Sequence, residues 1–404
     1  MKKDILFLCQ FFYPEHNSSA TLPFDTAGYL ANHGKSVDAM CGYPKEYSTE
    51  KNILLRENKN GVNIRRLRYL QLSRVGKLGR LINYFSFTAA VFMHIPVFRK
   101  YKSVIVYSNP PILPIVPIIA NILFKTQFVF VAYDIYPEVA YASHALSEKG
   151  AIAKIMQKIN HYLYGRAAAV VALTDEMKQF ILKNRPEIDE KRIEVIANWA
   201  HEKRSCPADE DAYKRFGYKK GQFIVTYFGN MGVCQDIETM LEAMKILKND
   251  SRIQFLIVGH GSKKAQVEDR TKEYPNVKVL DFLTGEAFEQ ALAISACSIV
   301  SLENGLMGTC APSKYYSYLQ SSQPVLAVVD EKSYLAEEIE KEKIGCSVRV
   351  GEGKKLSDAI LNLFTDESER HAMSVRARSL YEKKYEMSAA MDKYDRMFSR
   401  ILES

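Results

Sequence analysis

Short apolar runs alternate with amphipathic segments along the whole chain. The runs DILFLC, SVIVY and FVFVA in the first half, and FIVTYF, FLIV and SIVSL in the second, are typical of buried β-strands. Segments with a helical spacing of apolar residues, such as DIETMLEAMKILKN, lie between them. Because parallel strands need a crossover connection, this alternation predicts an α/β fold of doubly wound parallel sheets.

The alternation occurs in two series, and a polar, charged segment over residues 201–221 separates them. A chain of 404 residues also exceeds what one hydrophobic core usually supports. We therefore predict two Rossmann-like domains, over residues 1–200 and 201–384. Ligands bind at the carboxyl ends of the strands in such sheets, so a cleft between two of them suits a transferase with two substrates.

The net charge of +8 suits an anionic ligand, an anionic membrane surface or nucleic acid. The positive residues are not gathered into one arm and no nucleic-acid motif occurs, which disfavours a nucleic-acid partner. Seven scattered cysteines without a Cys-x-x-Cys motif predict reduced thiols. No apolar run has the length of a membrane span or of a signal-peptide core, so we expect a cytoplasmic protein.

Two glycine turns follow neighbouring predicted strands of the second half. Gly229 to Gly232 form the first turn, and Gly259 and Gly261 form the second. Backbone amides in such turns can cradle a phosphate, although a tight structural turn is the better explanation of the first one taken alone. Neither the dinucleotide nor the P-loop fingerprint is present.

A cation follows a third strand of the same series. SIVSL leads into a loop with Ala311-Pro312-Ser313, and Lys314 lies in the first turn of the next predicted helix. A cation there opposes the helix dipole, so Lys314 is either a solvated surface residue or is placed to meet a strong anion. Three anion-suited loops on one sheet edge favour the second interpretation.

The first half offers candidate residues in two loops. Ser18 and Ser19 lie in a polar loop after the first strand and are small enough for a ligand to approach the backbone. Asp134 and Glu138 follow the strand FVFVA, where carboxylates can act as acid and base or bind hydroxyls. An ordinary surface loop and capping of the next helix are the structural alternatives.

A basic and aromatic segment covers residues 74–102. The cations Arg74, Lys77, Arg80, Arg99, Lys100 and Lys102 flank an apolar middle with Tyr84, Phe85, Phe87 and Phe92. Such a segment is either a packed core helix with solvated ends or a helix that docks on an anionic lipid leaflet.

The motifs FFYPE, YDIYPE, VIANW, YFGNMGVCQDIETMLEA, FLIVGHG and PSKYYSYLQSSQPVLAV resemble retaining GT-B glycosyltransferases of family four, in the subgroup that builds capsule, O-antigen and other bacterial surface polysaccharides. The resemblance implies a nucleotide-sugar donor in the C-terminal domain and a lipid-linked saccharide acceptor in the N-terminal domain. It also implies that a helix over about residues 385–404 crosses back to the first domain. The expected location is the inner face of the cytoplasmic membrane, as a peripheral protein.

The same resemblance implies roles for individual residues. The diphosphate would meet the amides of the first glycine turn and the Lys314 ammonium, and the base would lie near Phe282 and Leu283. The implied donor-binding residues are Gly229, Asn230, Met231, Gly232, Gly259, Gly261, Phe282, Leu283, Thr309, Pro312, Ser313 and Ser317. The implied acceptor-binding residues are Asn17, Ser18, Ser19, Thr21 and Glu138, with Lys314 and Asp134 as the catalytic pair.

The sequence departs from the family at two places. Family four carries two glutamates eight residues apart, and Thr309 and Ser317 occupy these positions, so the ribose loses a charged partner and a thymidine-diphosphate donor such as dTDP-rhamnose becomes a hypothesis beside a UDP-sugar. The arginine and lysine that hold the diphosphate in the family are replaced by Asn230 and Gln235, which leaves Lys314 to supply the charge.

No convincing D-x-D metal motif occurs, so we expect neither a metal nor another cofactor. No carboxylate pair supports a double displacement. Two alternatives remain: a nucleotide-sugar epimerase with a GT-B-like fold, for which Asp134 and Glu138 are the only well-placed carboxylates, and a non-catalytic nucleotide-binding protein at the membrane.

Overall fold

The computed structural model describes residues 2–45, 48, 52–72, 77–142, 146–200 and 206–403. It divides into two compact units. Unit 1 comprises residues 1–198, 308–311 and 387–404, and unit 2 comprises residues 199–307 and 312–386. The first division falls after Asn198, close to the predicted boundary at residue 200, whereas the short segment 308–311 was predicted in the second domain.

The described residues of unit 1 form an eight-stranded sheet in the order β3-β4-β2-β1-β5-β6-β7-β8. All neighbouring pairs are parallel except β3 and β4. The strands are β1 (Lys3–Cys9), β2 (Val37–Gly42), β3 (Arg56–Lys59), β4 (Val62–Leu67), β5 (Tyr101–Tyr107), β6 (Gln127–Ala132), β7 (Ala169–Ala172) and β8 (Ile193–Val195).

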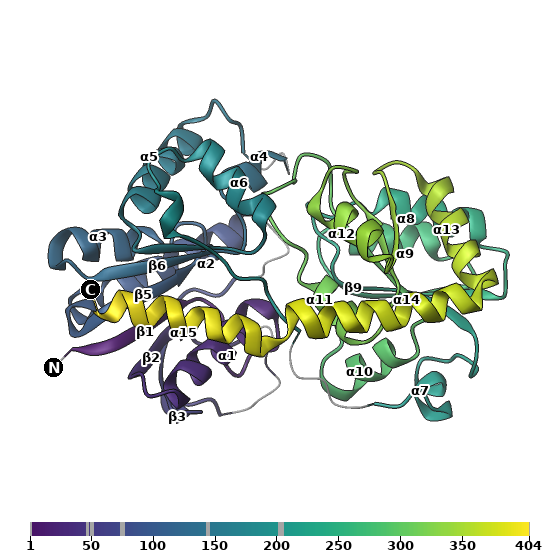
Figure 1. The fold of residues 1–404 in the computed structure, drawn as a ribbon, viewed down its shortest axis with the longest axis horizontal. Coiled ribbons are helices and arrows are strands. Elements are labelled where there is room, and N and C mark those ends of the chain that lie inside the picture. The colour runs from purple at the N-terminus through teal and green to yellow at the C-terminus, as the bar shows by residue number, and fades with distance from the viewer. Residues whose placement is uncertain are drawn as a thin grey trace. The chain divides into compact units, whose positions relative to one another are not determined.

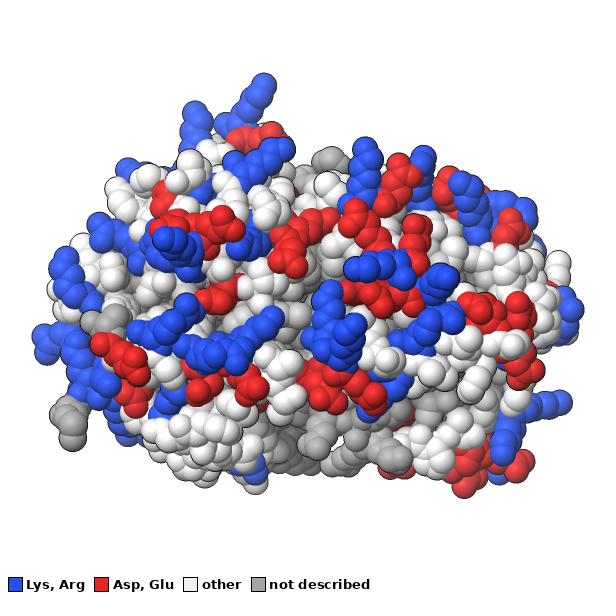
Figure 2. Space-filling model, viewed as in Figure 1, with Lys and Arg blue, Asp and Glu red and all other residues white. Residues whose placement is uncertain are grey.

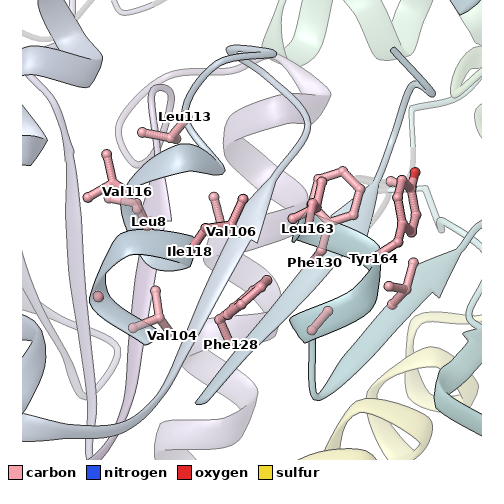
Figure 3. Packing of buried hydrophobic residues seen from close by; sticks show 14 of the residues in the cluster. Leu8, Val104, Val106, Leu113, Val116, Ile118, Phe128, Phe130, Leu163 and Tyr164 are labelled. Atoms are coloured by element: carbon pink, nitrogen blue, oxygen red, sulfur yellow. The ribbon is translucent and has the colours of Figure 1, made fainter. Parts of the chain in front are cut away.

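Helices cover this sheet and connect its parallel strands. They are α1 (Ser18–Asn32), α2 (Lys77–Phe92), η1 (Ile95–Lys100), α3 (Ile115–Phe124), α4 (Glu138–Ala142), α5 (Ala151–Arg166), α6 (Asp175–Asn184), η2 (Glu190–Arg192) and α15 (Met387–Glu403). The central strands are buried on both faces and therefore read as continuous apolar runs. Figure 3 shows part of the core, where strand residues Leu8, Val104, Val106, Phe128 and Phe130 lie near Leu113, Val116, Ile118, Leu163 and Tyr164.

The edge strand β3 was not predicted from the apolar runs, because it is polar and largely exposed. It forms an antiparallel hairpin with β4 in which Lys59 pairs with Val62. Asn60 and Gly61 form the two-residue turn with φ angles of 51° and 79°. A turn with two positive φ angles matches the twist of a hairpin, and Asn-Gly is the pair that adopts it most readily.

Helix α1 begins earlier than the sequence predicts. Ser18 and Ser19 were expected in a loop, but they form the first turn of α1, and Asn17 is its N-cap. The loop prediction was wrong because a Pro at residue 23 and the polar residues before it resemble a turn. Pro23 nevertheless lies inside α1, in its second turn, where it removes one intrahelical hydrogen-bond donor.

The last helix, α15, belongs to unit 1 and lies alongside α1 and β5 (Figure 1). Its buried face carries Met391, Tyr394, Met397 and Phe398. Tyr29 of α1 donates a hydrogen bond of 3.0 Å to Asp392, and Lys35 forms an ion pair with Asp395. These contacts place residues from the two ends of the chain in one unit.

The described residues of unit 2 form a six-stranded parallel sheet in the order β11-β10-β9-β12-β13-β14. The strands are β9 (Phe223–Asn230), β10 (Ile253–His260), β11 (Val277–Leu280), β12 (Cys297–Ser301), β13 (Val325–Val328) and β14 (Gly345–Val348). The helices are α7 (Glu210–Arg215), α8 (Glu238–Leu247), α9 (Lys264–Thr271), α10 (Gly285–Ala293), α11 (Lys314–Gln320), α12 (Tyr334–Glu342), α13 (Gly353–Thr365), α14 (Glu367–Leu380) and the π-helical η3 (Tyr381–Tyr385).

This strand order is that of a Rossmann sheet. Successive strands are added on one side of β9 as far as β11, and the chain then crosses to the other side of β9 to form β12. The two strands pair at Val225 with Cys297 and at Thr226 with Ser298. Beyond these residues toward their carboxyl ends the strands separate, and a crevice of this kind is where such sheets bind ligands.

Candidate functional site

The two glycine turns lie side by side at the carboxyl edge of unit 2. Strands β9 and β10 pair in parallel with Gly259 opposite Gly229 and His260 opposite Asn230. Gly259 has a φ of 155°, and a Cβ atom on it would overlap the carbonyl oxygen of Gly229. Glycine is therefore required where the two turns touch, and the predicted adjacency of the turns is present in the structure.

The amides of the first turn are partly occupied. The Met231 amide donates to the His260 carbonyl at 2.6 Å, which ties one turn to the other. The Gly232 amide donates to the Gln235 side-chain oxygen at 3.1 Å. A ligand can replace a side-chain acceptor more easily than a backbone carbonyl, so the expectation that Met231 offers its amide to a diphosphate does not fit this structure, whereas Gly232 can do so.

Helix α11 is fastened to the crevice by a tyrosine. The Tyr318 hydroxyl accepts a hydrogen bond of 3.0 Å from the Phe228 amide on β9 and donates one of 3.2 Å to the Ile299 carbonyl on β12. It thus satisfies backbone groups at the point where the two strands separate. The segment KYYSYL forms the predicted helix, and its register holds Lys314 at the end of β9.

Lys314 points into unit 2 and not to solvent. Its Nζ atom lies 3.8 Å from the centroid of the Tyr227 ring, and a Cβ atom on Gly229 would be 3.8 Å from it. Among the described residues this buried Nζ has no hydrogen-bond partner. The Tyr227 hydroxyl donates to the Asn230 carbonyl at 2.7 Å, so one aromatic residue contacts both the lysine and the glycine turn.

Burial lowers the pKa of the Lys314 ammonium from 10.5 to about 7. A buried cation without a hydrogen bond is costly, and a bound anion would restore its charge and supply the missing acceptors. The position therefore favours an anionic ligand beside the glycine turn over a structural role for the ammonium.

A second cation, missed by the sequence analysis, lies at the same turn. Lys263 Nζ donates to the Gln235 carbonyl and forms an ion pair with Glu303, each at 2.6 Å. The Lys263 amide donates to the Met231 carbonyl at 2.9 Å. The prediction that Lys314 supplies most of the cationic charge did not include Lys263, which brings a second ammonium to the residues that replace the usual arginine and lysine.

The other predicted donor residues are divided between the units. Phe282 follows β11, is 36% exposed and packs edge-on against His260 at a centroid distance of 5.4 Å, and Leu283 comes next in the chain. Pro312 and Ser313 lead into α11, and Ser317 is half-buried on it. Thr309 instead belongs to unit 1.

Thr309 belongs to unit 1 because its segment pairs with the backbone near Asp134. Its carbonyl accepts the Ile135 amide at 2.7 Å, and Cys310 forms a β-bridge with Asp134. The loop after β12 thus contributes one short segment to the other unit. The donor-binding role of Thr309 stays a prediction.

Asp134 and Glu138 have different surroundings in unit 1. The Asp134 amide donates to the Ser108 hydroxyl at 3.0 Å, while in the part of the chain that the structure describes its carboxylate has no hydrogen bond. Burial raises the pKa of this carboxyl from 3.8 to about 6. A carboxyl with such a pKa can accept a proton near neutral pH.

Glu138 is bound to Arg185, whose Nη2 atom lies 2.6 and 2.8 Å from its two carboxylate oxygens. It is also the first residue of α4, where an acidic side chain is favourable. The structural alternative therefore explains Glu138 better than acid/base work or acceptor binding.

The predicted acceptor residues at Asn17 to Thr21 form the start of α1. The Asn17 carbonyl accepts the amides of Ala20 and Thr21 at 2.9 and 3.0 Å. Its side-chain oxygen is buried and has no hydrogen-bond partner among the residues described. Ser19 remains a prediction, because no contact of its side chain distinguishes a ligand site from a helix start.

Among the described residues, no cluster of three or more His, Cys, Asp or Glu side chains has the arrangement of a metal site. No helix in the described part of the chain is both long and apolar enough to cross a lipid bilayer.

Comparison with known proteins finds a family model that matches most of unit 2. Residues 209–380 match the family described as glycosyl transferases group 1. The chain is also 26% identical over 251 residues to "Probable glycosyltransferase WbjE" of Pseudomonas aeruginosa, an alignment that spans 61% of this chain and 62% of that protein.

Solved structures share the fold over nearly the whole chain. Sucrose-phosphate synthase of Thermosynechococcus elongatus has a TM-score of 0.77 at 14% identity and covers 100% of both chains. Alr3699/HepE of Anabaena, solved in complex with UDP and glucose, has a TM-score of 0.73 at 16% identity over 98% of this chain and 100% of its own. The predicted fold class, GT-B with two Rossmann-like domains, is confirmed.

Proposed function

We propose that the protein is a glycosyltransferase that moves a sugar from a nucleoside-diphosphate sugar to a lipid-linked saccharide in the synthesis of a bacterial surface polysaccharide. The family match of residues 209–380 and the relation to WbjE support the reaction class. The sequence motifs support family four, retention of configuration and the capsule and O-antigen subgroup. The cytoplasmic membrane surface is the proposed working location.

The observation that carries this proposal is the buried, hydrogen-bond-free ammonium of Lys314 beside Gly229. In our proposal the diphosphate of the donor lies between Lys314 and the first glycine turn, and Lys263 adds a second cation. As the bond to the sugar breaks, negative charge grows on the diphosphate. Fixed cations in a water-poor site stabilise this charge and lower the barrier.

The nucleoside is assigned to the region of Phe282 and Leu283, in the segment that follows β11. HepE was solved with UDP, which supports a uridine donor. Ser317 in place of a glutamate removes a carboxylate that would grip two ribose hydroxyls, and this favours a deoxyribose donor such as dTDP-rhamnose. A direct comparison of UDP and dTDP binding separates the two.

Asp134 is our candidate for the residue that takes the proton of the acceptor hydroxyl. Its raised pKa keeps it basic at neutral pH without a permanent cationic partner. We place the acceptor in unit 1, near Asp134 and the start of α1 at Asn17. The reaction as proposed needs no metal or other cofactor.

The test is a thermal-shift panel with UDP, dTDP and their sugar conjugates. We expect one nucleotide at a hundred times its Kd to raise Tm by about 5 °C, because saturation of the folded state is worth about 2.7 kcal/mol. Lys314→Met should remove the shift. Lys264→Met should keep it, because this lysine at the start of α9 forms ion pairs with Asp281 and Glu268. No shift with any nucleotide diphosphate, or an equal shift in Lys314→Met, overturns the proposal.

An epimerase is less well supported. The Glu138 carboxylate forms an ion pair with Arg185, so it is a poor partner for Asp134 in acid/base catalysis. Incubation with one sugar nucleotide and no acceptor separates the two activities, since only an epimerase converts it. A non-catalytic binding protein would bind the nucleotide but transfer no sugar to a supplied acceptor.

A further inference from the structure

Helix α2 of unit 1 has two apolar faces, of which only one is covered. Phe87 and Val91 are fully buried in the core, and Phe87 packs edge-on against Tyr69 at 5.3 Å. The opposite side carries Leu78, Leu81 and Phe85, which are 71%, 50% and 60% exposed. A soluble helix normally has polar residues on its outer side, so this second apolar face calls for a partner.

The exposed apolar surface extends beyond these three residues. Phe92 and Met93 continue it at the end of α2, with 47% and 75% exposure. Leu70 and Leu72 lie alongside, because the Leu70 and Leu72 carbonyls accept hydrogen bonds from Ser86 and Asn83 of the same helix, and both leucine side chains are exposed. We call this set, with Leu78, Leu81 and Phe85, the α2 patch.

The aromatic residues of the basic and aromatic segment divide between its two interpretations. Phe87 belongs to the core and Tyr84 is half-buried, as a packed core helix requires. Phe85 and Phe92 are exposed as the docking interpretation requires. Arg74 lies outside the described residues.

The stretch of sequence that contains the α2 patch carries positive charges only, although Arg66 and Lys102 pair with Glu57 and Asp4 from outside it. From residue 58 to residue 133 the sequence contains eleven Lys and Arg and no Asp or Glu. Arg99 and Lys100 follow the patch in η1, and Lys125 caps α3, which packs against α2 and η1. All three are exposed, and no carboxylate pairs with them among the residues that the structure describes.

Charge elsewhere on the surface is mixed. On the face shown in Figure 2, Lys and Arg side chains lie among Asp and Glu side chains. A region with many cations and no carboxylate is therefore a local property of residues 58–133 and does not simply follow from the net charge of +8. An exposed apolar helix face with the cations Arg99, Lys100 and Lys125 near it is complementary to an anionic lipid bilayer. The acyl chains contact the apolar side chains, and the headgroups contact the cations.

We propose that the α2 patch, with Arg99, Lys100 and Lys125 at its border, docks unit 1 on an anionic lipid bilayer. This deepens the proposed function, since it names the surface at which a lipid-linked acceptor would be met, and it rests on that function only for the acceptor. The helix lies in the interface and does not span the bilayer. The cations supply attraction at a distance, and the leucine and phenylalanine side chains supply the inserted apolar area.

The test is co-sedimentation of the full chain with vesicles, without donor or acceptor. Vesicles of 30% phosphatidylglycerol in phosphatidylcholine are compared with pure phosphatidylcholine. Leu81→Ser with Phe85→Ser should lower binding at least tenfold, and Arg99→Gln with Lys100→Gln about twentyfold, since each cation near an anionic surface is worth about fivefold. Raising the salt to 0.5 M should release the wild type.

Unit 1 offers a matched control on another helix. Ile152 and Ile155 of α5 are 62% and 59% exposed, as the patch residues are, so Ile152→Ser with Ile155→Ser removes similar apolar area elsewhere. This control should bind anionic vesicles like the wild type. An unchanged Tm and nucleotide shift in every variant shows that folding and donor binding are intact.

Any of three results in the vesicle assay overturns the proposal. These results are a wild type that fails to bind anionic vesicles, a wild type that binds pure phosphatidylcholine vesicles equally well, and an α5 control that loses as much binding as the α2 variants. A dimer in solution that dissociates in Leu81→Ser with Phe85→Ser would assign the patch to a second copy of the chain and also overturns it. Because the vesicle assay contains no nucleotide, its failure is separate from a failure of the transferase proposal, which the nucleotide shift reports.

Discussion

Replacing Lys314 by methionine should make the protein more stable and at the same time unable to bind its donor. The change keeps the length of the side chain and removes a charge that burial disfavours. Lowering the pKa from 10.5 to about 7 corresponds to about 5 kcal/mol at ~1.4 kcal/mol per pH unit. The variant also loses the cation–π contact with Tyr227, so we expect a net gain of several kcal/mol at pH 6.5.

The pH dependence gives the prediction its sign. The folded-state pKa of Lys314 lies below that of the unfolded chain, so between pH 7 and 10.5 the unfolded state holds a proton that the folded state has lost. This contribution makes the wild type more stable as pH rises through that window, and the penalty is complete below pH 7. The advantage of Lys314→Met in unfolding free energy should therefore be largest at pH 6.5 and shrink by about 2 kcal/mol by pH 9.

Urea denaturation at pH 6.5 and 9 measures this difference, and calorimetry with UDP at both values measures the function. Wild-type affinity for UDP should fall above pH 7, because the amine must take up a proton to meet the diphosphate, and the methionine variant should bind about a hundredfold more weakly. Lys264→Met is the control. Asp281 raises the pKa of the Lys264 ammonium, so removing this charge should lower the unfolding free energy, whereas removing the Lys314 charge should raise it. A methionine variant less stable than the wild type at pH 6.5, or a UDP affinity independent of pH, refutes the reasoning.

Three further changes test neighbouring parts of the site. Glu303→Gln frees the Lys263 ammonium and should strengthen UDP binding about fivefold by calorimetry, whereas weaker binding would make the ion pair purely structural. Gly259→Ala places a methyl group on the Gly229 carbonyl and should lower Tm by more than 10 °C or prevent folding; a normal melting curve would contradict the close approach. Asp134→Asn should reduce transfer at least a hundredfold with an unchanged nucleotide shift, and the wild-type rate should rise with pH through about 6; a flat profile would remove this residue as the base.

The apolar pattern predicted the architecture because both sheets are buried on both faces. Each parallel strand then reads as an uninterrupted apolar run, and a helix follows it. The adjacency of Gly229 and Gly259 was also predictable, since turns after successive parallel strands meet at one edge. The strand β3 was not predictable from the sequence. It is a polar edge strand, so it shows no alternation of apolar and polar residues.

The site was harder to predict where partners lie far apart in the sequence. Lys263 resembles the other lysines of a polar helix start, and only folding brings Glu303, forty positions later, within 2.6 Å of it. Glu138 likewise looked like a free carboxylate until Arg185 was placed beside it. Lys314 was recognised because its neighbours in the chain, a loop and a helix start after a strand, already defined its surroundings.

The discontinuous make-up of unit 1 has a consequence for how the protein is made. Helix α15 covers α1 and β5, yet the ribosome adds its residues only after all of unit 2 has been translated. Until then the nascent chain leaves open the groove that Tyr394 and Phe398 fill. A chain that stops at residue 386 would keep this groove uncovered, so we expect it to need chaperones or to aggregate even though every strand of both sheets is present.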